Sequence, residues 1–290
     1  MRRMTFPRSV LTGLSCCALW AVASPSTAAT PALDCEGSGG EPRVIDITLD
    51  GVPALVRIPE TTTLAPIFLW HGFGPPASER ALMEALPLDG VPAIKVYLGL
   101  PMFGRRMHPR GMEELVERQQ KDVGLLVFEP VVMGAANELR NVAGALIEAG
   151  CLDPDEGVGL FGFSAGGAST LLALADRKVN VKAAVILNAS TGLSASVAAF
   201  ERATGQRYTW TPASRELADR SDAQKRAADI ASGTPPPALL IIHGKQDQMA
   251  PPELAVDLYE ALRPRYEQAG VQSRLQLALV SDMAHAWIGT

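Results

Sequence analysis

The hydrophobic pattern changes along the chain from alternation to continuous runs. "VIDITLDG" (44–51) and "PALVRIP" (53–59) alternate apolar and polar residues, which is typical of two half-exposed strands joined by a turn at Asp50-Gly51. The later apolar segments do not alternate, as expected for strands that are buried on both faces. These segments are "APIFLW" (65–70), "PAIKVYL" (92–98), "GVGLFGF" (157–163), "VKAAVILNA" (181–189), "PALLIIHG" (237–244) and "SRLQLALV" (273–280).

Segments with helical spacing separate most of these apolar runs. They are "SERALMEALP" (78–87), "GAANELRNVAGALIEAG" (134–150), "SAGGASTLLALAD" (164–176) and "PPELAVDLYEALRPRYEQAG" (251–270). Strands that alternate with helices predict an α/β fold, with a largely parallel sheet covered by helices on both faces. We expect about eight strands, with an antiparallel edge formed by the N-terminal pair.

Two stretches interrupt this alternation. Residues 99–133 are rich in Gly, Pro and Met and predict a long connection with some helix, whereas residues 190–234 hold no buried-strand run and predict mixed helix and loop. Because neither stretch resembles a linker between domains, residues 30–290 are predicted to form one domain with two insertions.

The N-terminus has the pattern of a signal peptide. Three arginines precede a 14-residue apolar stretch, "VLTGLSCCALWAVA", and small residues follow it. Residues 1–29 are therefore predicted to be a leader, with cleavage after Ala23 or Ala29, and the protein is predicted to be periplasmic or secreted. An uncleaved membrane anchor is the alternative, and the export route stays open.

The net charge limits the binding partners, and the cysteines raise the question of a disulfide. The formal net charge of −5 argues against nucleic acid and against a stably bound anionic membrane. Removal of the leader leaves two cysteines, Cys35 and Cys151, which in an exported protein either form a disulfide or stay as unpaired thiols. Nothing in the sequence fixes the oligomeric state.

The segment "GFSAGG" (162–167) carries the clearest chemistry. It lies where a buried strand gives way to a helix, and its glycines leave room for a sharp turn. Such a turn raises the Ser164 hydroxyl above the edge of the sheet, with the Ala165 N–H beside it. The pattern predicts Ser164 as a nucleophile and Ala165 as one donor to an oxyanion.

A serine hydroxyl needs a base, and the base needs an orienting carboxylate. His285 follows the last predicted strand and is favoured over the other three histidines, His71, His108 and His243. Asp247 follows the strand that ends in "IIHG" and is favoured as the carboxylate, with Glu253, Asp257 and Asp282 as alternatives.

The loop "HGFG" (71–74) follows the third predicted strand. Its glycines allow the backbone to approach a substrate, and the N–H of Phe73 is predicted to be the second oxyanion donor. We expect His71 to brace this loop through side-chain hydrogen bonds. A simple Gly/Pro turn is the alternative.

In this order, the "HGFG", "GFSAGG", "HGKQDQMAPPE" and "AHAW" segments resemble the α/β-hydrolase superfamily, and the resemblance covers nearly the whole chain after the leader. It is closest to the dienelactone-hydrolase-like and secreted serine esterase branches, although dienelactone hydrolases proper use a cysteine nucleophile. The resemblance implies a Ser164–Asp247–His285 triad, with Phe73 and Ala165 as the oxyanion hole. The sequence contains no metal-ligand cluster and no Gly-rich phosphate loop, so we expect no cofactor and no metal.

These patterns predict an exported serine hydrolase that cleaves a small-molecule or polymeric carboxylic ester through an acyl-enzyme. Trp70, Phe103 and Trp287 are candidates for the substrate pocket, with ordinary packing as the alternative for each. A peptidase or acyltransferase with the same triad remains open, as does a binding protein with this fold and no catalysis.

Overall fold

The two alternating segments at the start of the chain form the antiparallel edge of a sheet. β1 (Arg43–Leu49) pairs with β2 (Val52–Ile58), and Asp50 and Gly51 join them with φ angles of 46° and 80°. Positive φ at both central residues gives the tight hairpin turn whose twist matches the strands. This computed structural model describes residues 33–37 and 39–286, so the predicted leader lies outside the described residues.

Six further strands complete the sheet, in the spatial order β1-β2-β4-β3-β5-β6-β7-β8. β2 is antiparallel to both β1 and β4, and every other neighbouring pair is parallel. The eight-stranded, mostly parallel sheet with an antiparallel N-terminal edge confirms the prediction from the pattern. The six strands are β3 (Leu64–Trp70), β4 (Ala93–Leu98), β5 (Val158–Phe163), β6 (Val181–Leu187), β7 (Ala238–Gly244) and β8 (Leu275–Val280).

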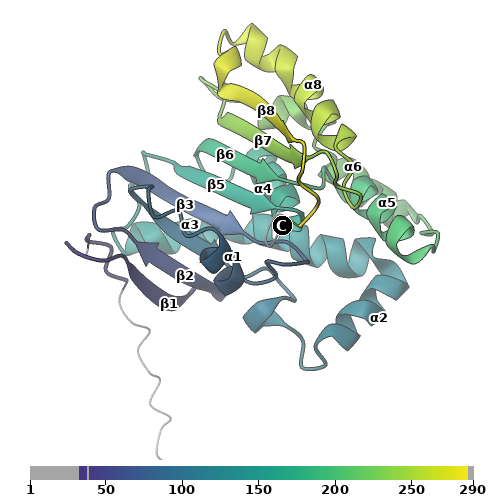
Figure 1. The fold of residues 1–290 in the computed structure, drawn as a ribbon, viewed down its shortest axis with the longest axis horizontal. Helices are drawn as coiled ribbons and strands as arrows, with labels where there is room; N and C mark the ends of the chain where they lie inside the picture. The colour runs from purple at the N-terminus through teal and green to yellow at the C-terminus, as the bar shows by residue number, and fades with distance from the viewer. Residues whose placement is uncertain (1–32, 38, 287–290) are drawn as a thin grey trace, which may run out of the picture. The chain divides into compact units, whose positions relative to one another are not determined.

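Helices cover the two faces of the sheet unequally. The larger apolar cluster joins one face to α3 (Gly134–Glu148), α4 (Ala165–Asp176) and α8 (Glu253–Gln268), and a smaller cluster joins the other face to α1 (Glu79–Ala85). Figure 1 shows α1 lying over the β2–β4–β3 part of the sheet. A short 3₁₀ turn, η3 (Gln272–Arg274), leads into β8. None of the helices among the described residues is long and apolar enough to span a membrane.

The segment 99–133 is more regular than its sequence suggests. It contains a 3₁₀ turn, η1 (Gly104–Arg106), then α2 (Met112–Asp122), and then a π-helix, η2 (Gly124–Met133), that runs directly into α3. The wider π spacing, seen where the Phe128 N–H donates to the Val123 carbonyl at 2.8 Å, accommodates Pro130, which has no N–H to donate. The connection was predicted to contain some helix, and most of its second half is helical.

The segment 190–234 contains mixed helix and loop, as predicted. Its helices are α5 (Leu193–Thr204), α6 (Pro212–Ser221) and α7 (Ala227–Ile230). In Figure 1, α2, α5 and α6 lie beyond the arrowheads of the parallel strands, at the carboxyl edge of the sheet. Ligands bind at this edge in open α/β sheets, so both insertions are placed to shape a site there.

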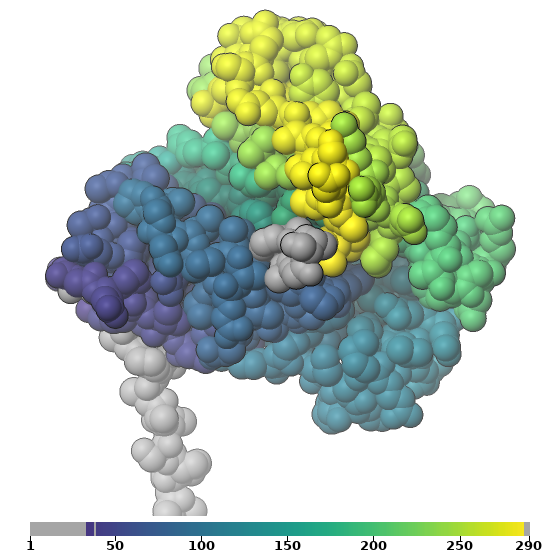
Figure 2. All heavy atoms as spheres, viewed as in Figure 1, coloured from purple at the N-terminus to yellow at the C-terminus, as the bar shows by residue number. Residues whose placement is uncertain are grey.

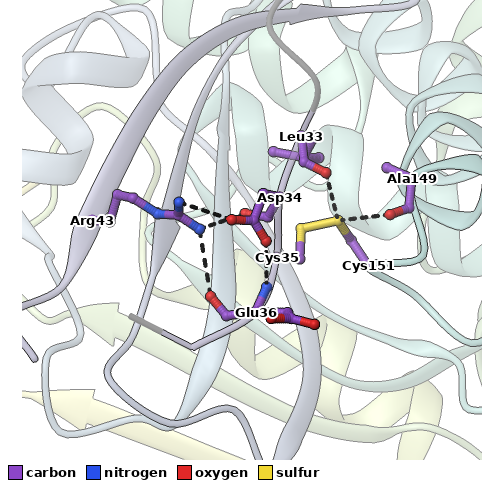
Figure 3. Close-up of a disulfide and its surroundings, with 7 residues drawn as sticks. All are labelled: Leu33, Asp34, Cys35, Glu36, Arg43, Ala149 and Cys151. Atoms are coloured by element: carbon purple, nitrogen blue, oxygen red, sulfur yellow. Dashed lines mark hydrogen bonds and ion pairs between the residues drawn. A yellow bond between two sulfur atoms is a disulfide. The ribbon is translucent and has the colours of Figure 1, made fainter. Parts of the chain in front are cut away.

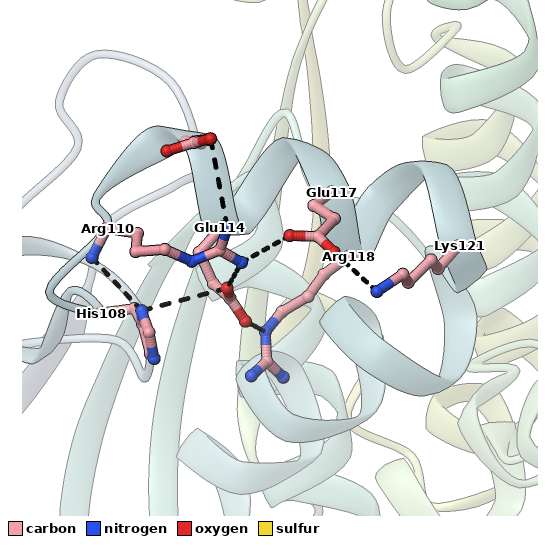
Figure 4. Close-up of polar contacts among 7 residues, drawn as sticks. His108, Arg110, Glu114, Glu117, Arg118 and Lys121 are labelled. Atoms are coloured by element: carbon pink, nitrogen blue, oxygen red, sulfur yellow. Dashed lines mark hydrogen bonds and ion pairs between the residues drawn. The ribbon is translucent and has the colours of Figure 1, made fainter.

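Polar contacts hold the exposed side of α2 (Figure 4). Arg110 contacts both Glu114 and Glu117, Arg118 Nε donates to Glu114 at 2.7 Å, and Lys121 Nζ donates to Glu117 at 2.6 Å. Exposed pairs of this kind contribute little to stability individually, so the network mainly keeps this surface of the insertion polar.

Cys35 and Cys151 form a disulfide (Figure 3), with 5.3 Å between their Cα atoms. It joins the segment before β1 to the turn after α3. Close by, the Arg43 guanidinium donates to the Asp34 carboxylate at 3.1 Å and to the Asp34 carbonyl at 2.7 Å. The first described residues are therefore tied to the sheet and to α3.

Candidate active site

Ser164 occupies a strained turn between β5 and α4. Its φ of 53° and ψ of −114° lie outside the usual regions for a residue with a side chain. A Cβ atom on Gly166 would lie 2.5 Å from the His71 carbonyl oxygen, so the turn fits against the neighbouring loop only with glycine at this position. This geometry is that of a nucleophile elbow, which presents the serine hydroxyl at the carboxyl edge of the sheet.

His285 reaches Ser164 from the loop after β8, of which residues 281–286 are described and are called here the histidine loop. Its Nε2 lies 2.9 Å from the Ser164 Oγ, across 121 residues of sequence. The Phe163 ring packs beside the imidazole, with 5.5 Å between the ring centroids. In the space-filling view the yellow C-terminal segment lies between the blue N-terminal half and the green insertion (Figure 2).

Asp247 is the carboxylate that contacts His285. It lies in the loop 245–252 between β7 and α8, called here the acid loop, and its Oδ2 is 2.7 Å from His285 Nδ1. The Asp247 Oδ1 accepts the N–H groups of Met249 at 2.9 Å and Ala250 at 2.8 Å. In the described part of the chain, the alternatives Glu253, Asp257 and Asp282 make no hydrogen bond or ion pair with His285.

The surroundings of Asp247 keep its carboxylate ionised. Burial raises the pKa of this carboxyl, but hydrogen bonds from His243, His285 and the Ala250 N–H outweigh burial and hold the pKa below its ordinary value. An ionised carboxylate that accepts the Nδ1–H of His285 leaves Nε2 free to accept the proton of Ser164. The three side chains therefore have the connectivity of a serine–histidine–aspartate triad.

His243 supports the acid loop, and the sequence offered it only as an alternative base. The residue is 1% exposed, and its Nε2 lies 2.7 Å from the Ala250 carbonyl and 3.4 Å from Asp247 Oδ2. An N–H group at Nε2 can donate to the Ala250 carbonyl and to Asp247 Oδ2, and it thereby fixes the acid loop at the end of β7. The sequence did hold a signal for this role. His243 ends a strand four residues before Asp247, and a histidine at the end of a strand can contact the loop that follows it.

The HGFG loop (71–74) lies directly against the nucleophile. A Cβ atom on Gly72 would be 2.9 Å from the Ser164 Cβ. Ala165 is the first residue of α4, where backbone N–H groups have no partner within the helix and the helix dipole favours negative charge. Both predicted oxyanion donors, Phe73 and Ala165, thus belong to segments that flank Ser164.

His71 braces the HGFG loop from below. Its ring is fully buried; Nδ1 lies 2.7 Å from the Gly72 carbonyl, and Nε2 accepts the Leu100 N–H at 3.2 Å. Burial lowers the pKa of His71 to about 4, so the ring is neutral and can accept at Nε2. These bonds couple the loop to the segment that follows β4.

The aromatic residues proposed for the substrate pocket have other surroundings. Trp70 is 1% exposed and packs beneath the elbow, where its Cβ would be 2.7 Å from a Cβ on Gly166. Phe103 is 2% exposed and stacks on Phe73, with 4.9 Å between centroids and 8° between planes. Trp70 and Phe103 therefore support the elbow and the HGFG loop from the core, which corrects the expectation, and Trp287 lies outside the described residues.

A cavity of about 650 Å³ opens beside His285, between the acid loop and the histidine loop. Its lining includes the polar side chains of Lys245, Gln246 and Gln248 and the apolar side chain of Met249. A second cavity of about 730 Å³ lies at the opposite edge of the sheet, where β6 and β7 begin, and it contains no triad residue. Within the described residues, no group of three or more His, Cys, Asp or Glu side chains is arranged to hold a metal ion.

The fold is shared with solved structures that include an esterase and a peptidase. TT1662 from Thermus thermophilus is 22% identical, with a TM-score of 0.63, and the match covers 85% of this chain and 92% of that one. Carboxyl esterase 2 from Tuber melanosporum is 19% identical, with a TM-score of 0.55 and coverage of 88% and 80%. The acylaminoacyl peptidase of Pyrococcus horikoshii is 19% identical, with a TM-score of 0.56, and the match covers 85% of this chain but only 37% of that one.

The strand order of the sheet, the nucleophile elbow and the similar solved structures together define an α/β-hydrolase fold. The protein belongs to the class of serine hydrolases with this fold. The sequence profile of the prolyl oligopeptidase family matches residues 135–290, and the chain belongs to that family. A sequence search of curated proteins returns no match. The matched region begins at α3 and contains Ser164, Asp247 and His285.

Proposed function

We propose that this chain is an exported serine hydrolase that cleaves carboxylic esters through an acyl-enzyme intermediate. One observation carries the proposal: Ser164 Oγ lies 2.9 Å from His285 Nε2, and His285 Nδ1 lies 2.7 Å from Asp247 Oδ2. Both distances are within hydrogen-bond reach.

The proposed reaction has two halves. His285 Nε2 takes the Ser164 proton while Oγ bonds to the ester carbonyl carbon, and the carbonyl oxygen becomes an oxyanion near the N–H groups of Phe73 and Ala165. The carbon–oxygen bond to the alcohol then breaks, and the same proton passes from His285 to the leaving alkoxide. Water repeats the sequence on the acyl-enzyme, which releases the carboxylic acid and returns the proton to Ser164.

Esters are proposed ahead of amides because of the leaving group. An alkoxide leaves more readily than an amine anion, so a triad and two N–H donors meet the demands of ester cleavage. A peptidase is the second candidate, and the match to the prolyl oligopeptidase family favours it. The similarity to an acylaminoacyl peptidase and to puromycin hydrolase motivates tests with amide substrates.

Export is the second part of the proposal. The leader pattern of residues 1–29 supports it, and so does the Cys35–Cys151 disulfide, because disulfides persist mainly in oxidising compartments. The periplasm or the medium would meet this requirement. Fractionation of cells, with N-terminal sequencing of the mature protein, tests it: an unprocessed N-terminus in the cytosol contradicts export.

A fluorophosphonate probe tests the hydrolase itself. We expect one adduct at Ser164 by mass spectrometry, with labelling lost in Ser164→Ala and reduced to background in His285→Ala. His108→Ala is the matched control, since His108 is 45% exposed and contacts the α2 network instead of the triad. A folded wild-type chain that takes no label would contradict the hydrolase and favour a binding protein.

Substrate class needs a separate comparison. A panel of p-nitrophenyl and alkyl esters of rising chain length is assayed beside aminoacyl and N-acylaminoacyl anilides. We expect kcat/KM to be higher for the esters than for the anilides. A higher value for any anilide would move the assignment to the peptidase.

A further inference from the structure

The turn Leu187–Ser190, at the carboxyl end of β6, contacts the elbow from both sides. The Leu187 carbonyl accepts the Ser164 N–H at 3.0 Å, and the Ser190 N–H approaches the Ser164 carbonyl at 3.4 Å. These two backbone contacts therefore fix the position of Ser164 relative to this turn.

Asn188, within the same turn, is bonded to the strand that leads to the acid loop. Its backbone N–H donates to the Ile242 carbonyl at 3.0 Å, and its side-chain Oδ1 accepts the Gly244 N–H at 2.8 Å. Gly244 ends β7, three residues before Asp247. The position of the acid loop is thus fixed relative to the position of the elbow.

The amide nitrogen of Asn188 holds the histidine loop. Nδ2 donates to the carbonyls of Ala284 and His285, at 2.9 Å each. The residue is fully buried, and both N–H groups and the carbonyl of its amide are bonded. The histidine loop also lies tightly on the end of β7, since a Cβ atom on Gly244 would be 2.1 Å from the Met283 carbonyl.

Asparagine is the side chain that meets all of these demands. The φ of Asn188 is 46°, a left-handed conformation that asparagine tolerates better than most residues. Glycine would accept this backbone but would leave the Gly244 N–H and two carbonyls without their partner. Aspartate would still accept from Gly244, but it would set a carboxylate oxygen against the carbonyls of Ala284 and His285.

We propose that Asn188 is a positioning residue that sets the location of His285 relative to Ser164 and Asp247; its kinetic consequence rests on the proposed function. It touches no reacting atom, and it acts by holding the backbone carbonyls of residues 284 and 285. A displaced imidazole is least able to deliver its proton to the leaving group, so poor leaving groups suffer most.

The test uses Asn188→Asp and Asn188→Gly in the full chain, with Asn180→Asp as the matched control. Asn180 lies just before β6, at the opposite edge of the sheet from the triad. We expect kcat for an alkyl ester to fall about 100-fold in both variants, with KM nearly unchanged and a smaller loss for a p-nitrophenyl ester, which needs little protonation of its leaving group. Asn180→Asp keeps wild-type rates with both esters.

Proton NMR supplies a readout that does not depend on turnover. The far-downfield resonance of the His285 Nδ1–H bonded to Asp247, assigned by its loss in His285→Ala, should disappear or shift in both Asn188 variants. If Asn188→Gly is unfolded at the assay temperature, Asn188→Asp decides, because it keeps the bond to Gly244. Circular dichroism reports the folded fraction.

The proposal is overturned if folded variants keep the wild-type kcat for the alkyl ester. It is also overturned if both esters lose the same factor while the resonance stays in place, since that pattern indicates a smaller folded fraction. A wild-type chain that neither turns over esters nor takes the probe contradicts the proposed function. The NMR comparison would still decide whether Asn188 positions His285.

Discussion

Asp247 accepts more hydrogen bonds than orientation of one imidazole requires. Two backbone N–H groups of the acid loop bind Oδ1, while His285 and His243 approach Oδ2. The carboxylate therefore organises its own loop and the histidine together. Because its side chain is fully buried, the negative charge is poorly screened and acts strongly on its neighbours.

We expect Asp247→Asn to lower kcat for esters by about 10⁴-fold, because an amide no longer holds the Nδ1–H tautomer of His285. Asn retains an oxygen for the Met249 and Ala250 N–H groups, so circular dichroism should show a retained fold. Asp282→Asn is the control, since Asp282 lies in the histidine loop whereas Asp247 is the carboxylate bonded to the imidazole. Equal losses in the two variants would contradict the assignment of Asp247.

His71 makes the stability of the fold depend on pH. Its pKa falls from 6.5 to about 4 on folding because the ring is buried, so between these values the unfolded chain binds a proton that the native chain does not. The free energy of unfolding should therefore decrease as the pH falls from 6.5 to 4, by at most about 3 kcal/mol from this residue. Asp247, whose pKa is lowered, loses its own stabilising contribution only as the pH falls below the range of an ordinary carboxyl.

Urea unfolding at several values between pH 7 and 4.5 measures this dependence. His71→Gln keeps a donor and an acceptor but does not titrate, so its stability should fall less steeply than that of the wild type. If the free energy of unfolding falls equally with pH in the wild type and in His71→Gln, His71 does not cause the pH dependence.

At the residue scale, local sequence was enough to single out Ser164, Asp247 and His285 as candidates. Each lies in the turn or loop that follows a recognisable strand, and parallel strands bring their carboxyl ends to one edge of the sheet. Asn188 was not predictable in this way. Its side-chain partners are the carbonyls of Ala284 and His285 and the N–H of Gly244, all distant in sequence, and no residue type in the sequence marks such a backbone contact.

At the element scale, the elbow depends on the closeness of β5 to the first turn of α4. A Cβ atom on Gly162 would lie 2.2 Å from the Gly166 carbonyl oxygen and 2.4 Å from the Thr170 hydroxyl. Both contacts are far inside van der Waals distance, and one of the atoms is backbone. The glycine at position 162 is therefore required by close packing of strand on helix.

Gly162→Ala should lower the free energy of unfolding by about 3 kcal/mol or more, at the upper end for an overpacked core. Gly144→Ala is the matched control within α3, because nothing lies within 4 Å of a Cβ at that position. It should raise stability by about 0.5–1 kcal/mol, the usual gain for alanine over glycine inside a helix. Chemical denaturation measures the free energy of unfolding of both variants. A Gly162→Ala variant as stable as the wild type would show that close packing does not require glycine at position 162.

The hydrophobic pattern of the sequence predicted the strands better than the helix boundaries between residues 112 and 148. The strands follow their apolar runs closely, because burial on both faces leaves few polar interruptions. By contrast, Pro130 and Gly124 interrupt the sequence pattern of a helical segment that continues from α2 through η2 into α3. The π spacing that tolerates Pro130 is stabilised by contacts with the neighbouring helices α4, α5 and α6, which the local sequence does not reveal.

For the described molecule as a whole, the disulfide and the triad lie at opposite edges of the sheet. Cys151 lies in the turn that precedes β5, whereas Ser164 lies just after β5 ends. The disulfide closes a loop over a sequence separation of 116 residues, which removes many conformations from the unfolded chain. It should therefore act on stability much more than on the geometry of the site.

We expect the double variant Cys35→Ser/Cys151→Ser to be less stable than the oxidised wild type by about 2–5 kcal/mol in denaturant titrations. At a temperature where the variant remains folded, its kcat and KM for esters should equal those of the wild type, because no triad contact involves the described residues that precede β1. Wild-type protein reduced with dithiothreitol should match the variant in both measurements. A loss of kcat at full folding would instead mean that the turn after α3 influences the elbow through β5, so that the disulfide affects activity as well as stability.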